Sequence, residues 1–302
     1  MATTLITILG PTATGKTKFA AKLAHKFSGE IISADSRQVY IGMDIGTGKD
    51  LSDYVIENEM VQYHLIDIVH PNHEFNLFSF KELFANTFRD IESRNKLPFL
   101  VGGTGLYLSS ILQNYDLKQA DFNSTAANEL RKKSIEELRE QTLKLIPNLH
   151  VKGDLQSKER MVKAILVAEA EKELKALPSI NALILGINFP RDEIKARITD
   201  RLAKRMKEGL IDEVKKLIQS GITHERLESF GLEFKFISYY LSDKMNYDEM
   251  FQKLNTAIHQ FSKRQMTWFR KMEREGVKII WLNGHDFEKA CTLIEKGLSS
   301  GS

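Results

Sequence analysis

Short runs of consecutive apolar residues alternate along the chain with segments whose apolar positions recur every three or four residues. The runs have the length of β-strands, and they cover residues 5–9, 30–34, 64–68, 98–101, 182–187 and 277–282. Uninterrupted apolar strands are typical of a parallel sheet that is covered on both faces. Because helical patterns separate them, the sequence predicts an α/β core with a parallel sheet flanked by helices.

Helical periodicity is clearest just after the first strand. Phe19, Leu23 and Phe27 recur every four residues and predict a helix from Lys16 to about Phe27. Helix-rich patterns return over residues 191–220 and 247–274. The low proline content, six in 302 residues, also favours long helices.

No convincing strand pattern occurs between residues 113 and 178. Ser134 has the character of a helix N-cap, and residues 158–175 predict another helix. We therefore interpret residues 113–178 as a helical insertion domain. The core itself would consist of residues 1–112 and 179–302.

Composition narrows the class of protein. Apolar residues make up 42% and charged residues 27%, as in ordinary globular proteins, and the net charge of +3 does not by itself predict nucleic-acid binding. The single cysteine, Cys291, excludes an internal disulfide framework and a cysteine-based zinc module. There is neither a basic leader nor an apolar run near the ~18 residues of a membrane span. We expect a soluble, cytoplasmic protein that has no membrane partner.

One motif immediately suggests phosphate chemistry. It matches the pattern G-x-x-x-x-G-K-[ST] between a predicted strand and a predicted helix, and consists of Gly10, Pro11, Thr12, Ala13, Thr14, Gly15, Lys16 and Thr17. Backbone N–H groups and a helix N-terminus attract phosphate oxygens there, and the lysine adds a charge. Thr17 is the expected ligand of Mg²⁺. This P-loop predicts a site for a diphosphate or triphosphate, such as that of a nucleotide. It does not establish that the ligand is ATP.

Two further segments follow predicted strands. Asp35 follows the second strand, and a turn with three glycines in four residues, 102–105, follows the fourth. The carboxyl ends of parallel strands share one edge of the sheet, where ligands bind. Asp35 there could hold Mg²⁺, act as a base, or simply cap a helix. Thr104 would project at the same edge, although the glycines also fit a tight turn without a ligand.

Basic residues gather on two predicted helices. Arg197, Arg201 and Arg205 recur at intervals of four, which suits phosphate recognition but also a solvated helix face. Residues 258–274 interleave five basic residues with Phe261, Trp268 and Phe269. That mixture fits RNA backbone contact with base stacking, and it equally fits an amphipathic core helix.

These motifs occur in an order that resembles the tRNA dimethylallyltransferase (tRNA isopentenyltransferase) family, bacterial type. The resemblance covers nearly the whole chain, and the segments that carry it are residues 10–17, 35–40, 42–47, 64–67, 102–107, 197–201 and 263–270.

The resemblance implies a fold, a reaction and roles for residues. It implies a P-loop-type core with an insertion that grips the anticodon stem-loop of tRNA, and transfer of a dimethylallyl group from dimethylallyl diphosphate to N6 of adenosine 37 with release of pyrophosphate. Asp35, Thr104 and Arg201 match catalytic positions, and the P-loop and Arg197 match the diphosphate site. The implied tRNA contacts are Asp35, Ser36, Arg37, Gln38, Thr104, Glu159, Arg160, Met161, Val162 and Lys163. We take a monomer as the working state.

The sequence departs from the family pattern in places. Residues 230–235 read Phe-Gly-Leu-Glu-Phe-Lys where the family usually has Ile-Gly-Tyr-Lys/Arg, and the eukaryotic zinc finger is absent. Three alternatives stay open: an adenylate (AMP) isopentenyltransferase, a small-molecule P-loop kinase, and an RNA-binding module with a vestigial P-loop. The first should not need the insertion, and the second does not explain Asp35 together with Thr104. Intact Lys16 and Thr17 argue against the third.

Overall fold

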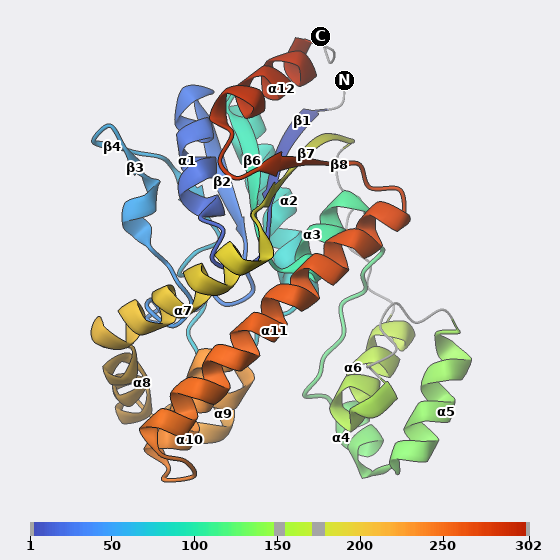
Figure 1. Cartoon of the computed structure of the whole chain (residues 1–302). Helices are drawn as coiled ribbons and strands as arrows, with labels where there is room; N and C mark the ends of the chain where they lie inside the picture. The colour runs from blue at the N-terminus through green and yellow to red at the C-terminus, as the bar shows by residue number, and fades with distance from the viewer. Residues whose placement is uncertain (1–2, 148–154, 171–178, 300–302) are drawn as a thin grey trace. The chain divides into compact units, whose positions relative to one another are not determined.

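The computed structural model describes residues 3–147, 155–170 and 179–299 of the chain. It divides into two compact units (Figure 1). One unit is Met1–Gln113 with Leu177–Ser302, and the other is Asn114–Ala176. We refer to them as the core and the helical unit, and each is described by itself.

A six-stranded sheet organises the core. Its strands lie in the order β5-β2-β6-β1-β7-β8, and every neighbouring pair is parallel. The strands are β1 (Thr3–Leu9), β2 (Gly29–Ala34), β5 (Tyr63–His64), β6 (Leu97–Gly102), β7 (Ile180–Asn188) and β8 (Ile279–Asn283). The predicted parallel α/β fold class is confirmed. A short antiparallel pair, β3 (Val55–Ile56) with β4 (Glu59–Met60), lies apart from this sheet.

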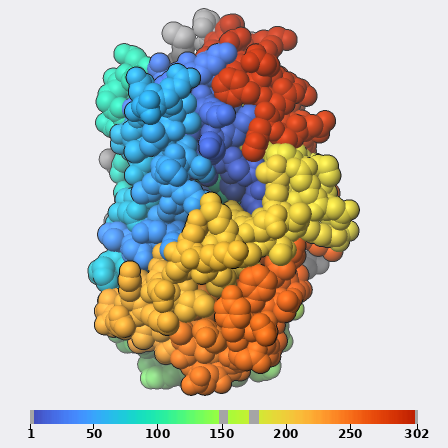
Figure 2. All heavy atoms as spheres, turned by 60° about the vertical axis from the view of Figure 1, so that its left-hand side comes forward, coloured from blue at the N-terminus to red at the C-terminus, as the bar shows by residue number. Residues whose placement is uncertain are grey.

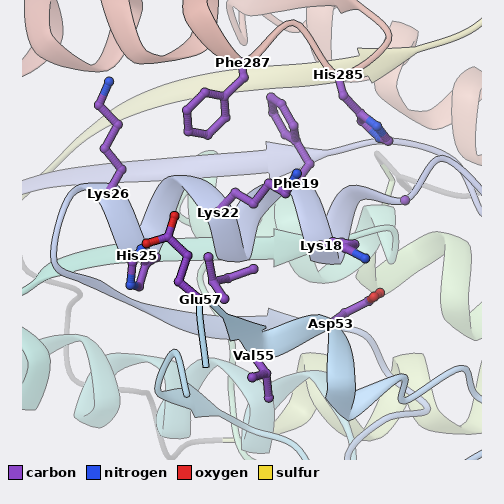
Figure 3. A pocket seen from close by; sticks show the side chains of 12 residues that line it. Lys18, Phe19, Lys22, His25, Lys26, Asp53, Val55, Glu57, His285 and Phe287 are labelled. Atoms are coloured by element: carbon purple, nitrogen blue, oxygen red, sulfur yellow. The ribbon is translucent and has the colours of Figure 1, made fainter. Parts of the chain in front are cut away.

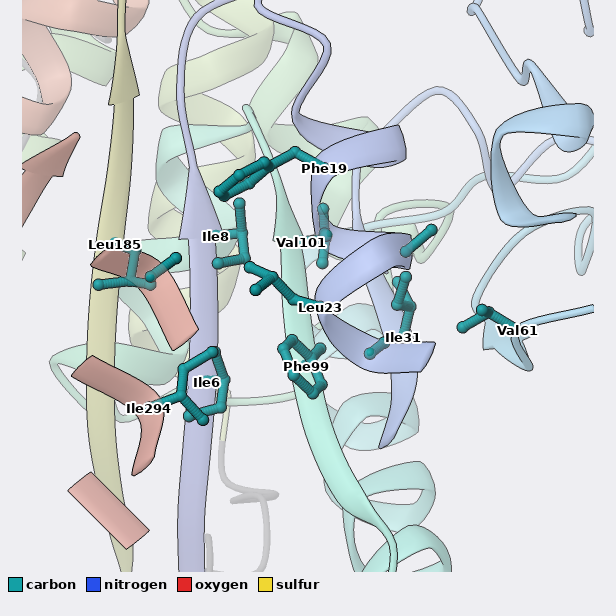
Figure 4. Close-up of a cluster of buried hydrophobic side chains, with 14 of the residues drawn as sticks. Ile6, Ile8, Phe19, Leu23, Ile31, Val61, Phe99, Val101, Leu185 and Ile294 are labelled. Atoms are coloured by element: carbon teal, nitrogen blue, oxygen red, sulfur yellow. The ribbon is translucent and has the colours of Figure 1, made fainter. Parts of the chain in front are cut away.

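Both faces of the sheet are covered, which explains the uninterrupted apolar strands. In β1, Ile6 and Ile8 pack into one buried cluster and Leu5 and Leu9 into another. Figure 4 shows the first cluster, in which Phe19 and Leu23 from α1 (Lys16–Lys26) lie over the strands. β1 therefore contributes apolar side chains in both directions.

The remaining helices of the core complete these layers. They are α2 (Leu77–Ser93), α3 (Gly105–Leu112), α7 (Arg191–Lys207), α8 (Leu210–Gln219), α9 (His224–Ser229), α10 (Leu232–Leu241), α11 (Tyr247–Arg274) and α12 (Phe287–Ser299), with a 3₁₀ turn η1 at Leu51–Tyr54. The amino-terminal half of α11 packs with α7 to α10 through Met250, Leu254 and Ile258. Its carboxyl-terminal half packs on the sheet through Phe269 and Met272.

The helical unit has a core of its own. It contains α4 (Thr125–Lys132), α5 (Ile135–Leu145) and α6 (Lys158–Glu169). Leu130, Leu138, Met161 and Ile165 are among its buried residues. The predicted cap at Ser134 is confirmed, because its hydroxyl accepts the N–H of Glu137 and the Glu137 carboxylate accepts the N–H of Ser134.

Several predicted boundaries are wrong. The strand predicted over residues 64–68 is only the two-residue β5, because Leu65 and Asp67 adopt left-handed backbone conformations that end it. The helix predicted to reach Lys175 ends at Glu169, and residues 171–175 of that prediction lie outside the described residues. Within the described part of the chain, no helix is long and apolar enough to cross a membrane.

Candidate active site

The candidate site lies where the parallel strands end. β1 sits between β6 and β7, neither of which is its neighbour in sequence, so the chain crosses over in both directions from it. Ligands of open parallel sheets bind at such a switch point, outside the carboxyl ends of the strands. The P-loop follows β1, Asp35 follows β2, and Gly103 and Thr104 follow β6. Figure 2 shows α7 (yellow) beside the dark blue N-terminal segment.

The P-loop backbone is shaped for an anion. Ala13 and Gly15 both have φ near +65°, and Gly15 is the N-cap of α1. Left-handed residues in such a turn point successive N–H groups into one concavity, at the helix N-terminus. The Thr14 hydroxyl donates to the carbonyl of Pro11 at 2.8 Å, which fixes the turn from inside.

Two cations meet at this loop. Lys16 makes only a long hydrogen bond of 3.4 Å from Nζ to the Pro11 carbonyl, and burial lowers its pKa to about 8, opposed by the nearby Asp35 carboxylate. Arg201 of α7 donates to the hydroxyl of Thr12. Burial, with Arg205 beside it, lowers the pKa of Arg201 to about 10. Both groups are partly stripped of water, so an arriving polyanion would be strongly attracted.

The three predicted phosphate arginines do not act alike. Arg201 reaches the P-loop, but Arg197 pairs with Glu193 at 2.8 Å and stacks over the ring of Phe189 at 4.1 Å. Arg205 is buried against Gly48, with Asp50 at 3.8 Å. Its Nη2 has no hydrogen-bond partner among the described residues.

Asp35 and Thr104 both accept hydrogen bonds from the backbone of the turn that follows β2. The Thr104 hydroxyl accepts the N–H of Ser36 at 3.1 Å, and the Asp35 carboxylate accepts the N–H of Arg37 at 2.9 Å. Asp35 therefore does not cap a helix, because the residues after it form turns. Its carboxylate stays close enough to Lys16 and Arg201 to oppose the lowering of the pKa of both that burial causes.

The turn at residues 102–105 needs its glycines for contacts with the protein. A Cβ on Gly103 would lie 2.5 Å from the side-chain nitrogen of Gln265, and one on Gly105 would lie 2.4 Å from the ring of Trp268. The space next to these glycines is thus filled by α11. At these two positions the packing of α11 by itself requires glycine.

Two aromatic residues in the carboxyl-terminal half of α11 pack inside the protein. Phe269 is fully buried, and the indole N–H of Trp268 donates to the Ser109 hydroxyl at 2.8 Å. Phe261, in contrast, is exposed. For Phe269 and Trp268 the structure therefore favours the core-helix interpretation over base stacking.

Some site residues received no role from the sequence. Gln265 is buried and bonds to Thr12 and to Gly103. Its position in a stripe of otherwise mainly apolar residues could have marked it, since a buried amide needs partners. Glu213 of α8 accepts the N–H groups of Asp44, Ile45 and Gly46 at 2.7–2.9 Å and so fixes the loop before η1.

Gln38 and Glu233 border the same region. The Gln38 amide donates to the Gly48 carbonyl at 3.1 Å and accepts from the Ser33 hydroxyl, so its side chain supports the loop. Glu233 stands in the segment that departs from the family pattern. Burial raises its pKa, and Arg205 and Arg201 oppose that rise. This segment therefore places an acidic group beside the two arginines.

A cavity of about 1030 Å³ borders α1 and reaches Gly15 of the P-loop (Figure 3). Lys18, Lys22 and Phe19 line it from α1, and His285 lines it from the loop before α12. The His285 ring stacks on Phe19, and its Nε2–H donates to the Thr14 carbonyl at 2.6 Å. Neither Lys16 nor Asp35 lines this cavity, so we do not assign it to the site.

The predicted RNA segment of α6 is half buried within the helical unit. Met161 and Val162 are fully buried in its core. Glu159 pairs with Arg131 at 2.8 Å, and Lys163 lies over the ring of Phe122. Side-chain contact with RNA from this segment would have to come from Glu159, Arg160 and Lys163, not from Met161 or Val162.

Among the described residues, no cluster of three or more His, Cys, Asp or Glu side chains is placed to hold a metal ion. That pattern does not argue against Mg²⁺, which usually keeps several waters and takes only one or two protein oxygens beside substrate phosphates. The Thr17 hydroxyl, at the start of α1 behind the phosphate loop, fits such a donor set.

Comparison with known proteins places the chain. A family model described as IPP transferase matches residues 38–272, and one described as isopentenyl transferase matches residues 3–63. The chain belongs to the IPP transferase family. This confirms the resemblance inferred from the motifs.

Curated members of the family align over nearly their whole length. A tRNA dimethylallyltransferase 1 of Geotalea uraniireducens is 49% identical over 94% of this chain and 94% of its own. One of Syntrophus aciditrophicus is 47% identical over 94% of this chain and 95% of its own. The solved tRNA isopentenylpyrophosphate transferase of Bacillus halodurans is 30% identical, with a TM-score of 0.72 over 98% of this chain and 97% of its own.

Proposed function

We propose that this protein transfers a dimethylallyl group from dimethylallyl diphosphate to N6 of adenosine 37 in tRNA and releases pyrophosphate. The observation that carries the proposal is the meeting of two groups at one sheet edge. One is a P-loop with Lys16 and Arg201, and the other is a carboxylate, Asp35, tied to Thr104. Family membership and the names of the relatives support the same reaction.

The donor side neutralises the leaving group. The bond from C1 of the allyl group to the diphosphate oxygen breaks, and its electron pair leaves with the pyrophosphate. Lys16 and Arg201 hold positive charge at the P-loop, where that negative charge develops. Preorganised cations at the place where charge develops in the transition state are among the largest contributions to catalysis.

The acceptor side activates the nucleophile. The adenine N6 lone pair is delocalised into the ring, so the amine is a poor nucleophile until it loses a proton. Asp35 accepts that proton as the N6–C1 bond forms. The Thr104 hydroxyl accepts the N–H of Ser36, and in this way it orients the neighbouring carboxylate of Asp35, the general base. The adenosine reaches this position by leaving its stack in the anticodon loop.

Mg²⁺ fits the same site as a partner of the diphosphate. Thr17 would hold it together with diphosphate oxygens, in the donor set described above. When bound, such an ion adds further positive charge against the leaving group.

Binding of the tRNA would use both units. On the core, residues 35–38 border the acceptor position, and Gln38 supports the adjoining loop. On the helical unit, Glu159, Arg160 and Lys163 of α6 offer polar groups. Basic residues of α11, such as Lys263 and Arg270, add charge that suits an RNA backbone. We also propose that the protein acts as a monomer in the cytoplasm.

The test is to offer one labelled donor to several acceptors. The protein with Mg²⁺ and radiolabelled dimethylallyl diphosphate is incubated separately with unmodified tRNA, an anticodon stem-loop, AMP and ATP. We expect label in tRNA and the stem-loop, at N6 of adenosine 37. Robust labelling of AMP without preference for RNA would indicate an adenylate-specific enzyme. If no acceptor takes up label, the proposed transferase activity is rejected. Light scattering of the same protein measures its molar mass and so tests whether it is a monomer.

A further inference from the structure

A single buried amide joins the two halves of the candidate site. Gln265 lies near the middle of α11 and is 7% exposed. It falls in the buried stripe formed by Ile258, Ser262, Phe269 and Met272. Burying an amide without partners is unfavourable, so its hydrogen bonds determine whether it is tolerated.

Both ends of this amide bind backbone atoms of the glycine-rich turns. Its Oε1 accepts the N–H of Thr12 in the P-loop at 2.8 Å, and its Nε2–H donates to the carbonyl of Gly103 at 2.8 Å. A backbone N–H can only donate and a carbonyl can only accept, so the partners determine which way the amide points. A side chain of this length with one donor and one acceptor end is needed to bridge them.

Each partner continues into a proposed catalytic group. The Thr12 hydroxyl accepts from Arg201, on the donor side. Gly103 precedes Thr104, whose hydroxyl accepts the N–H of Ser36, next to Asp35. Hydrogen bonds connected by short covalent links thus lead from Arg201 to the residue next to Asp35, and Gln265 is the central link.

We propose that Gln265 is a positioning residue, which sets the distance between the diphosphate loop and the acceptor loop and thereby the approach of N6 to the allylic carbon. The inference rests on the proposed function. Gln265 does not touch either reacting atom. It acts by holding Thr12 and Gly103 at a constant separation.

Such a role predicts a loss in the chemical step. A misplacement of about 1 Å between reacting groups can cost about 10²-fold in rate. We expect Gln265→Met, which keeps the length but removes both bonds, to lower kcat by about 10²-fold. The affinity for pyrophosphate in calorimetry and the KM for an anticodon stem-loop should change little, because the groups proposed to bind each substrate remain.

The matched control is another glutamine of the same helix. Gln260 is exposed, so Gln260→Met makes the same chemical change away from the turns and should leave kcat unchanged. Thermal melting of both variants gives the folded fraction to which each rate is referred. A purely structural role would lower the melting temperature of Gln265→Met but leave kcat per folded molecule intact, and that result would overturn the proposal.

A second variant keeps the test open if Gln265→Met folds poorly. In Gln265→Glu the protonated carboxyl can still accept from Thr12 and donate to Gly103, whereas the ionised carboxylate faces the Gly103 carbonyl without a proton. Burial, the Gly103 carbonyl and the Asp35 carboxylate raise the pKa of the introduced carboxyl. The nearby Lys16 and Arg201 lower it.

The kcat of Gln265→Glu, divided by the kcat of the wild type at the same pH, should therefore rise as pH falls from about 8 to about 5. The ratio removes any pH dependence that the wild-type rate itself has. A ratio that does not change with pH would contradict the bridge. If the wild type itself transfers no label to RNA, the proposed function fails. If the wild type is active and Gln265→Met equals it, only the present inference fails.

Discussion

The two glycine-rich turns at the sheet edge look alike in sequence but differ in structure. In the P-loop, Ala13 and Gly15 have left-handed backbones, and Lys16 makes a long hydrogen bond of 3.4 Å to the Pro11 carbonyl. In the turn after β6, Gly103 and Gly105 are packed against Gln265 and Trp268. The first turn is shaped to receive a ligand. The second is shaped to receive α11, and in doing so it places Thr104 beside Asp35.

Glycine therefore has two different roles in these turns. One lets backbone N–H groups surround an anion, and the other lets a helix approach a strand end. If this is correct, variants on the donor side should impair binding of the diphosphate. Variants on the acceptor side should impair the chemical step or the packing, and leave diphosphate binding intact.

The largest expected effect is on the acceptor side. Asp35→Asn keeps the shape of the side chain but cannot accept the N6 proton, so kcat should fall by about 10²–10⁴-fold, as for loss of a general base. Binding of pyrophosphate in calorimetry should stay close to wild type. Substantial rescue by added Mg²⁺ would show that Asp35 acts on the metal instead.

On the donor side, Lys16→Ala removes a charge that faces the phosphates. A hydrogen bond to a charged group contributes roughly 1.5–3 kcal/mol, so the affinity for dimethylallyl diphosphate should weaken by about 10- to 10²-fold. Calorimetry without RNA measures it directly. The exposed Lys18 on the same helix provides a control as Lys18→Ala. Equal affinities for Lys16→Ala and the wild type would remove the P-loop from this role.

The packing of the second turn can be tested without any substrate. Gly105→Ala places a methyl group 2.4 Å from the Trp268 ring, so the free energy of unfolding should drop by about 1–3 kcal/mol, as for overpacking. Urea denaturation measures this change. Gly297→Ala in α12 is the control, because its Cβ would meet only Leu183 at an ordinary 3.4 Å. That control should be neutral or stabilising, since alanine favours a helix.

The lowered pKa of Lys16, about 8, adds a pH signature to the donor side. Below pH 8 the amine is charged in the empty site and attracts the diphosphate. Bound phosphates raise the pKa of this amine, so affinity is lost as pH rises through 8 and binding takes up a proton there. The second ionisation of the terminal phosphate of dimethylallyl diphosphate lies at about pH 6, as in a phosphate monoester, and so below this range. The effect should vanish in Lys16→Met, and a persistent pH dependence there would contradict the assignment.

The smallest effect is expected outside both turns. Replacing Arg160 and Lys163 with Ala should raise the KM for tRNA and leave diphosphate affinity unchanged. Because such contacts are electrostatic, the wild-type KM for tRNA should rise with salt, more steeply than that of the double variant. The matched control is Lys132→Ala with Lys133→Ala, which removes the same charge elsewhere in the helical unit. A KM that does not depend on salt would exclude these residues from RNA binding.

Much of the core could be predicted because its signals are local. Apolar runs placed five of the six sheet strands within a few residues, and Tyr247–Arg274 forms one helix as its periodicity indicated. The run at residues 64–68 failed, since apolar content cannot reveal the left-handed residues Leu65 and Asp67. The family assignment was correct because ordered motifs are themselves a property of the sequence.

By itself, the sequence determined which groups are available: a phosphate loop, a carboxylate after β2, a threonine after β6 and a basic helix. Only the tertiary structure decided which of them meet. It brought Arg201 to Thr12 while Arg197 turned to Glu193, and it buried Phe269 where sequence alone also allowed base stacking. Gln265 shows the reason most clearly, because its partners lie 253 and 162 residues away. Periodicity reports which face of a helix is buried, but the atoms that a buried amide will meet are set by the packing of α11 against the sheet edge.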